Sequence, residues 1–159
     1  MTRPFAMLLP AALVAAVMAA PGLIEQAHPV AHRSTPTTCM TGAQASTSGY
    51  VLNYTAVEDS AAGNRFYDIA PGFNTDHSVG SAMNLPVAHG DDANAYASFK
   101  CQFTCNATPG CVSFFGRFVQ VNSTSERFEC LGFDTLLDDS SFTASTGNMA
   151  NGGFNKLCD

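Results

Sequence analysis

Three of the six cysteines of this chain lie within one stretch, Lys100 to Cys111, with the sequence KCQFTCNATPGC. Thiols in such a cluster can act as nucleophiles, bind a metal ion or form disulfides. A reactive thiol needs a neighbour that lowers its pKa, and the nearest histidine in the sequence is His89. Structural zinc sites more often show paired C-x2-C motifs or closely spaced histidines. The spacing therefore favours disulfides.

The first residues of the chain predict the compartment of these thiols. Arg3 provides a short positive region, and the apolar run from Phe5 to Ala20 is interrupted by Pro10 and ends in small residues. This run is too short to span a bilayer comfortably and is typical of a secretory signal peptide, which we expect at residues 1–19. A membrane anchor is the alternative, but no stop-transfer pattern follows. Export to oxidising surroundings favours disulfides again.

Imidazole and carboxylate groups come close together in the sequence at two places, Asp76–His77 and His89–Asp92. A general base or a metal site is conceivable there, but neither place has H-x3-H spacing. The carboxylate pairs Asp138–Asp139 and Glu126/Glu129 occur without an aromatic cleft of the glycosidase kind, and we expect them to be solvated. Nucleophile-elbow, phosphate-loop and dinucleotide motifs are absent from the sequence. We predict no catalytic residue, no metal ion and no cofactor.

The residues around Cys101 and Cys105 predict one helix, within GDDANAYASFKCQFTCNATPG. Asp91 or Asp92 is expected to cap its start, where negative charge suits the positive end of the helix dipole. Residues 106–110 should end it, because proline cannot continue the helix and glycine permits a turn. Since residues four apart share a helix face, both sulfurs point towards whatever the helix packs on.

The chain after this helix predicts antiparallel sheet. CVSFFGRFVQV, residues 111–121, is rich in Phe and Val that alternate between two faces. NSTSE is expected to turn, and RFECLGF to return as a second strand that carries Cys130. Further strands are expected in GYVLNYTAV, NRFYDIA and GFNKLCD, whereas residues 74–90 and 134–153 are predicted to be loops.

This arrangement narrows the possible disulfide pairings. A tight turn from the helix end to the strand brings Cys105 next to Cys111. Cys101, one helical turn earlier, should reach Cys130 on the neighbouring strand, and the first and last cysteines remain for each other. The predicted bonds are nested: Cys39–Cys158, Cys101–Cys130 and Cys105–Cys111.

The order of these features resembles the PAN/apple domain family. The similarity rests on a helix with C-x3-C, a third cysteine that opens an aromatic strand (CVSFF), a later cysteine on the next strand (FECLGF) and two cysteines that frame the unit. TPGCVSF is also similar to PAN-like modules of secreted fungal proteins. The resemblance implies an α+β fold, in which an antiparallel β-sheet carries one α-helix across it, with the same nested disulfides. The stretch between Cys39 and Cys101 is longer than in compact apple domains.

The expected organisation has three parts. Residues 1–19 form the signal peptide, residues 20–38 a flexible leader rich in Pro, Ser and Thr, and residues 39–159 a single PAN/apple-like domain. The formal net charge of −6 and the lack of a basic patch make nucleic acid and anionic membranes poor partners. The acidity fits neutral glycans or basic partners, and solubility alone also explains it.

Three sequons predict glycosylation in a eukaryotic secretory pathway, at Asn53, Asn106 and Asn122. Asn122 lies in a predicted turn, whereas Asn106 lies between a cysteine and a proline. Chance is the alternative explanation, because the chain is rich in Asn, Ser and Thr.

The expected function is that of a secreted, non-catalytic recognition module, since PAN/apple domains mediate protein–protein or protein–carbohydrate contacts. The alternative is a small secreted structural or effector-like glycoprotein of the cell wall or extracellular space. The ligand-binding residues are unknown from the sequence. The predicted loops at residues 74–90 and 134–153 are candidate faces, because loops carry recognition on a rigid scaffold, although both are also explained as connectors.

Overall fold

The computed structural model describes residues 37–57 and 65–159. The predicted signal peptide lies outside this part of the chain, as does the predicted leader apart from its last two residues. No helix among the described residues combines the length and the apolar character needed to cross a membrane. The elements are β1 (Ser46–Thr47), β2 (Tyr50–Val51), β3 (Tyr54–Val57), β4 (Tyr67–Ile69), α1 (Pro71–His77), β5 (Ser78–Leu85), α2 (Asp91–Ala107), β6 (Ser113–Asn122), β7 (Ser125–Phe133), the 3-10 helix η1 (Asp139–Ser141), β8 (Phe142–Ala144) and β9 (Asn148–Lys156).

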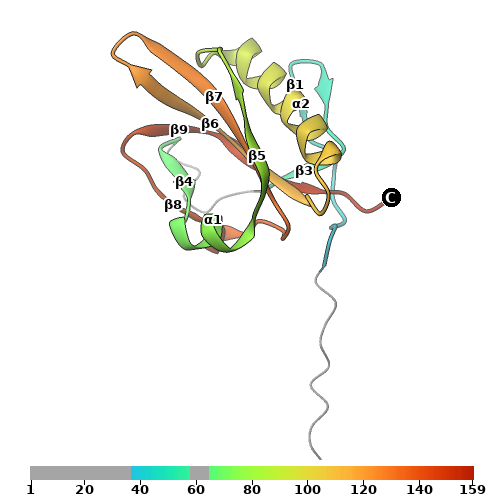
Figure 1. Cartoon of the computed structure of the whole chain (residues 1–159). Helices are drawn as coiled ribbons and strands as arrows, with labels where there is room; N and C mark the ends of the chain where they lie inside the picture. Colours follow the sequence, from blue (N-terminus) through green and yellow to red (C-terminus); the bar gives the residue numbers. More distant parts are fainter. Residues whose placement is uncertain (1–36, 58–64) are drawn as a thin grey trace, which may run out of the picture. The chain divides into compact units, whose positions relative to one another are not determined.

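A five-stranded antiparallel sheet in the order β3-β9-β6-β7-β5 forms the centre of the fold (Figure 1). β6 is its middle strand and pairs with β7 from Ser113, opposite Phe133, to Asn122, opposite Ser125. Phenylalanine and valine favour this strand, and its buried residues follow one another because both of its faces are covered. The predicted hairpin of two aromatic strands is present.

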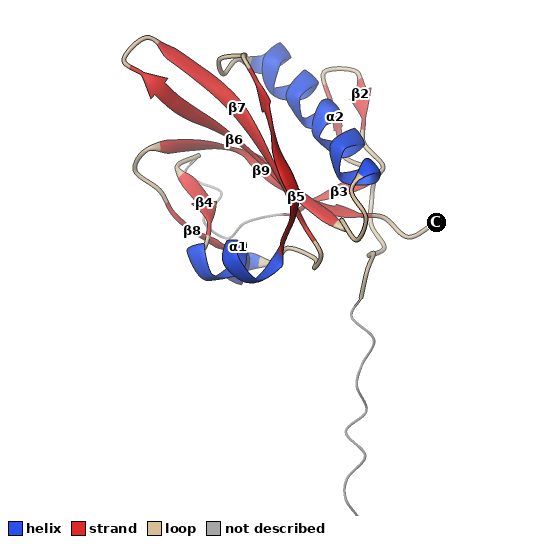
Figure 2. Cartoon of the chain, in the orientation of Figure 1, coloured by secondary structure: helices blue, strands red, loops and turns tan. Residues whose placement is uncertain are grey.

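α2 packs across one face of this sheet (Figure 2) and contacts β6, β7 and β5, as well as β2. Phe114 and Phe118 of β6 point towards the helix, where Ala97 and Cys101 are fully buried. Burial of this apolar surface is the main force that holds the helix on the sheet. The core between the two layers consists of Leu52, Tyr54, Ala97, Cys101, Cys105, Cys111, Phe114, Phe118, Phe128, Cys130 and Phe154.

The start of α2 differs from the prediction. Neither predicted aspartate is the capping residue: the N-cap is Gly90, and Asp91 is the first residue of the helix. Asn94 supplies a local hydrogen bond instead, because its Oδ1 accepts from the backbone N–H of Gly90 at 3.1 Å. The other end is as predicted, since Thr108 leaves the helical conformation and Gly110 turns the chain with a φ of 80°.

The opposite face of the sheet carries a second apolar core beneath the ribbon β4–β8 and α1 (Figure 1). Phe115 of β6 and Phe133 of β7 are fully buried there. The core consists of Ile69, Phe115, Phe133, Leu137 and Ala150, with partly buried Val57, Tyr67, Phe73, Leu131 and Phe142 around it. The described chain is thus a mixed α+β fold with mostly antiparallel strands. It contains two α-helices, whereas the resemblance implied only one.

Residues 74–90 are not the loop that the sequence predicted. They contain the end of α1 and the whole of β5, which pairs with β7 at the edge of the main sheet. Only alternate residues of β5, such as Val79 and Met83, pack against the core, so its Ser, Gly and Asn residues give a weak strand pattern. Residues 134–153 also contain more structure than predicted, namely η1, β8 and the first part of β9.

Candidate recognition surfaces

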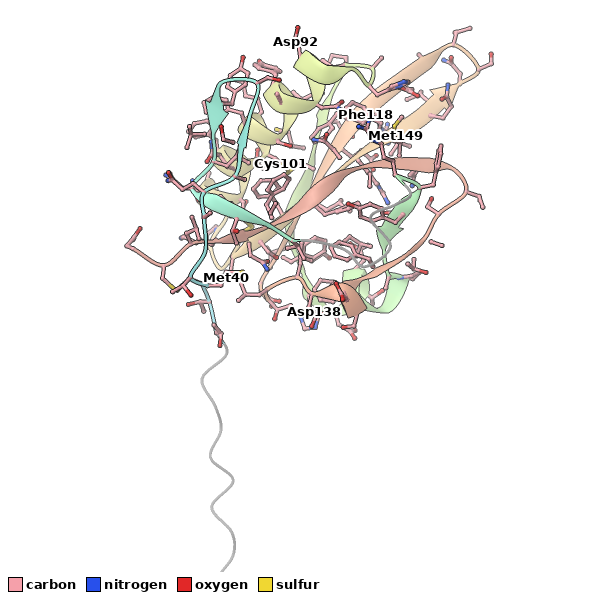
Figure 3. The ribbon with its side chains drawn as sticks, turned by 180° about the vertical axis from the view of Figure 1, so that it is seen from behind. Met40, Asp92, Cys101, Phe118, Asp138 and Met149 are labelled. Carbon is pink, nitrogen blue, oxygen red and sulfur yellow. A yellow bond between two sulfur atoms is a disulfide. The ribbon has the colours of Figure 1, made fainter. Side chains whose placement is uncertain are left out.

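All six cysteines lie in the described part of the chain and are joined in pairs. Cα–Cα distances of 5.0, 5.7 and 5.3 Å within the three pairs fit disulfide geometry. The bonds are Cys39–Cys158, Cys101–Cys130 and Cys105–Cys111, which are the pairs derived above from the helix and strand pattern. Cys101 lies between α2 and the sheet (Figure 3), so the second bond attaches the helix directly to β7.

The two histidines singled out in the sequence each contact a carboxylate that is distant in the chain. His77 Nδ1 lies 3.1 Å from Oδ1 of Asp134, and His89 Nδ1 lies 2.8 Å from Oε2 of Glu126. Hydrogen bonds from the His89 side chain and backbone lower the pKa of Glu126. Within the described residues no group of three or more His, Cys, Asp or Glu side chains has an arrangement suited to a metal ion.

Glu129 is not solvated, although the sequence suggested that it would be. Only 7% of this residue is exposed, and its carboxylate accepts from Arg117 and Arg127. Burial alone would raise its pKa, but these hydrogen bonds and the two positive charges outweigh burial and leave the pKa below its ordinary value. Arg117 also binds Asp68 of β4, so these groups form a structural network on the sheet rather than a glycosidase pair.

An exposed group of aromatic rings lies on the outer side of α2, a feature that the sequence reasoning missed. We call Tyr50, Tyr96, Phe99 and Phe103 the aromatic ridge. Two of its members are well exposed: Tyr96 at 38% and Phe103 at 53%. The helical members are spaced at i, i+3 and i+7, which places them along one side of the helix. This spacing was visible in the sequence, but it also fits a buried helix face.

The rings of the aromatic ridge pack against one another at angles. The centroids of Tyr50 and Phe99 lie 4.9 Å apart, and those of Phe99 and Phe103 lie 5.0 Å apart with their planes at 85°. Lys100 places its ammonium group 5.4 Å from the ring centre of Tyr96, within the range of a cation–π contact. The ridge is therefore an ordered apolar surface with one positive charge beside it.

Gln102 holds the two elements of the aromatic ridge together. Its side chain is almost fully buried, its Oε1 accepts from the backbone N–H of Asn53 at 3.1 Å, and its Nε2 donates to the carbonyl of Val51 at 3.4 Å. These bonds fix the β2 segment against α2, which carries Phe99. Two disulfides anchor the same helix below. The ridge is thus formed before any partner arrives.

A cavity of about 520 Å³ lies on the other face of the sheet. We call it the η1 pocket. Met40, Val57 and Leu137 form its apolar side, and Asp138, Asp139 and Ser140 form its polar side. Met40 and Asp138 lie at the end of the domain away from Asp92 at the start of α2 (Figure 3). The η1 pocket uses part of the predicted 134–153 face, whereas none of its lining residues comes from 74–90.

The three sequons differ in how the fold presents them. Asn122 is exposed at the end of β6, next to the turn that leads to β7, and its Oδ1 accepts from both the backbone N–H and the hydroxyl of Thr124 at 3.0 Å. Asn106 lies in the last turn of α2, where its Oδ1 accepts from the Tyr54 hydroxyl at 2.8 Å. Asn53 is exposed, and its Oδ1 accepts from Gln44. All three asparagines are exposed, and Asn122 is the one beside a turn between two strands.

No protein-family model matches this chain, and comparisons with curated proteins and with solved structures find no match either.

Proposed function

We propose that the chain is an exported recognition module of the PAN/apple type that binds an extracellular protein or a glycan and catalyses no reaction. The observation that carries this proposal is the aromatic ridge. Large apolar side chains on a protein surface usually lie scattered, whereas the exposed rings of Tyr96 and Phe103 belong to one group that ring contacts through Tyr50 and Phe99 hold together. Exposed aromatic rings supply large contact areas for proteins and for the apolar faces of sugars.

The rigid support of the aromatic ridge favours recognition as its role. Binding costs less entropy when the contacting side chains are already ordered. The ring contacts of Tyr50 with Phe99, the Gln102 hydrogen bonds and the disulfides of α2 all provide such order. The ridge itself carries rings rather than pairs of acid and base groups, so its chemistry suits contact and not catalysis.

Export is supported by the disulfides and by the apolar N-terminal sequence. Three disulfides in a chain of this size are typical of secreted proteins, because the cytosol keeps thiols reduced. The PAN/apple assignment is supported by the nested pairing and by one long helix across an antiparallel sheet. Both features are those that the sequence resemblance implies.

A binding screen with paired variants tests the proposal. The secreted domain is applied to a glycan array and to immobilised extracellular and cell-wall proteins. We expect saturable binding, and we expect Phe103→Ser to weaken it at least tenfold. Val121→Ser is the matched control, because Val121 is also 53% exposed but lies on β6.

The outcomes separate the candidate functions. Glycan binding that depends on Phe103 supports a carbohydrate module, and protein binding that depends on Phe103 supports a protein module. Equal binding by wild type and Phe103→Ser would exclude the aromatic ridge as the contact surface. Tight association with a wall or host protein that Phe103→Ser leaves unchanged would favour the structural or effector-like glycoprotein instead.

A further inference from the structure

The η1 pocket lies on the face of the sheet opposite the aromatic ridge. Leu137 and Val57 belong to the second core, on the side away from α2, and Asn155 lines the pocket from β9. Asn155 is 3% exposed, and its side-chain amide bonds to both the N–H and the carbonyl of Leu137 at 2.8 Å. These bonds fix the start of the η1 segment against the sheet. A cavity of about 520 Å³ is within the usual size range for ligand sites.

The polar side of the η1 pocket is negatively charged. Hydrogen bonds from Ser140, and further ones from Ser141, outweigh burial and lower the pKa of Asp138, which keeps its carboxylate ionised. Asp139 is exposed beside it. The residues that line the pocket include no lysine or arginine. Lys156 follows Asn155 on β9, but successive strand residues point to opposite faces, so Lys156 belongs to the other side of the sheet.

We propose that the η1 pocket binds a lysine side chain of a basic partner. The four-carbon stem of lysine would lie against Met40, Val57 and Leu137, as long basic side chains commonly do on apolar surfaces. The ammonium group would meet the carboxylates of Asp138 and Asp139. The acidic net charge of the chain, −6, favours the approach of such a partner.

At Asp138 the geometry favours an ammonium group over a guanidinium group. Oδ1 of Asp138 already accepts from the N–H of Ser140 at 2.9 Å, from its hydroxyl at 2.6 Å and from the hydroxyl of Ser141 at 3.2 Å. A planar guanidinium binds best to two free oxygens of one carboxylate. A compact ammonium needs only single contacts with Oδ2 of Asp138 and with Asp139.

This site goes beyond the function proposed above, and it is tested separately. The aromatic ridge lies on α2 and β2, whereas the η1 pocket lies on the other face, so Phe103→Ser should leave the pocket unchanged. If the domain binds lysine but nothing binds to the aromatic ridge, only the proposed function fails. If a partner binds to the ridge but lysine does not bind to the η1 pocket, only the present proposal fails.

The experiment is an NMR titration of the isotope-labelled, disulfide-intact domain with Nα-acetyl-lysine amide. We expect saturable shifts at the backbone amides of residues 137–140 and of Met40. Nα-acetyl-norleucine amide has the same stem without the ammonium group and should bind more weakly. High salt should also weaken binding of the lysine compound, because the contact is electrostatic and exposed.

The matched variants are Asp139→Asn and Asp92→Asn, and each removes one negative charge. Asp139 lines the pocket, whereas Asp92 lies away from it. Asp139→Asn should weaken binding of Nα-acetyl-lysine amide about two- to fivefold, the range for exposed ion pairs. Asp92→Asn should bind like the wild type. Equal binding of the lysine and norleucine compounds, unchanged binding by Asp139→Asn, or no saturable shift with the lysine compound would each overturn the proposal.

Discussion

Arg117 on β6 donates from Nη1 to both carboxylate oxygens of Asp68 on β4, at 2.7 and 2.6 Å. The same guanidinium donates through Nε and Nη2 to Glu129 on β7 at 3.1 and 2.8 Å. Asn148 on β9 adds a bond to Asp68 at 2.6 Å. One side chain therefore links the β4–β8 ribbon to the central strands. The contact matters because β4 is only three residues long and pairs with β8 alone.

Replacing Arg117 with methionine should strongly destabilise the domain. The side chains of Asp68 and Glu129 are only 13% and 10% exposed, and the change leaves their charges poorly compensated. We expect the free energy of unfolding to fall by roughly 3 to 5 kcal/mol, measured by urea denaturation with the disulfides intact. Arg127→Met is the control: Arg127 binds the same Glu129 but is 44% exposed, so the loss should be about 1 kcal/mol or less. Equal losses of unfolding free energy in the two variants would contradict the structural role of Arg117.

Acidification should remove part of the stability through Glu129. The folded-state pKa of this carboxyl lies below its ordinary value of 4.5, so its contribution is fully present above pH 4.5. The contribution is lost as the pH falls through the folded-state pKa, where the native carboxylate takes up its proton. Urea unfolding at a series of pH values should therefore show a smaller acid-induced loss for Glu129→Gln than for the wild type. Parallel pH curves for the two proteins would count against the assignment.

The bridge Cys101–Cys130 should stabilise the domain more than Cys105–Cys111. The two bonds close chain segments with sequence separations of 29 and 6, and a longer closed loop restricts the unfolded chain more. In the chain-entropy model their contributions are ~3 to 4 and ~2 to 3 kcal/mol. The paired replacements Cys101→Ala/Cys130→Ala should thus lower the melting temperature and the secreted yield more than Cys105→Ala/Cys111→Ala. A larger effect of the second pair, or different partners in peptide mapping of the non-reduced protein, would refute this prediction.

Asn122 should be the preferred glycosylation site in a eukaryotic secretory host. It is exposed beside the turn to β7, and the Thr124 hydroxyl already contacts its Oδ1, whereas Asn106 lies in a helix and bonds to Tyr54. Asn122→Gln should remove a glycosidase-sensitive mass, and Asn106→Gln should leave the mass distribution of glycans unchanged. The intact mass of the secreted protein before and after glycosidase treatment checks both. If Asn122→Gln kept the full glycan mass, Asn122 would not be the preferred glycosylation site.

The elements that the sequence predicted well are those with strong local signals. The start of α2 was located to within one or two residues although the predicted capping residue was wrong, because an alanine-rich acidic segment can begin a helix without a side-chain cap. β6 and β7 were evident from their aromatic pattern. β5 was missed because an edge strand needs few apolar residues. Gly116 gave no signal either, yet a Cβ there would lie 2.6 Å from Cζ of Phe128.

The sequence by itself determined the helix and the aromatic hairpin, since both depend on residue spacing over short distances. It also determined a disulfide pattern, since each cysteine had few possible partners. The tertiary structure decided the Arg117 network, the aromatic ridge and the η1 pocket. Arg117 and Asp68 are 49 residues apart in the chain, and only the pairing of β6 with β9 and the packing of β4 on this sheet bring them together. Tyr50 contacts Phe99, and Leu137 and Val57 line one pocket, for the same reason: these long-range arrangements follow from how the elements pack, which no local pattern encodes.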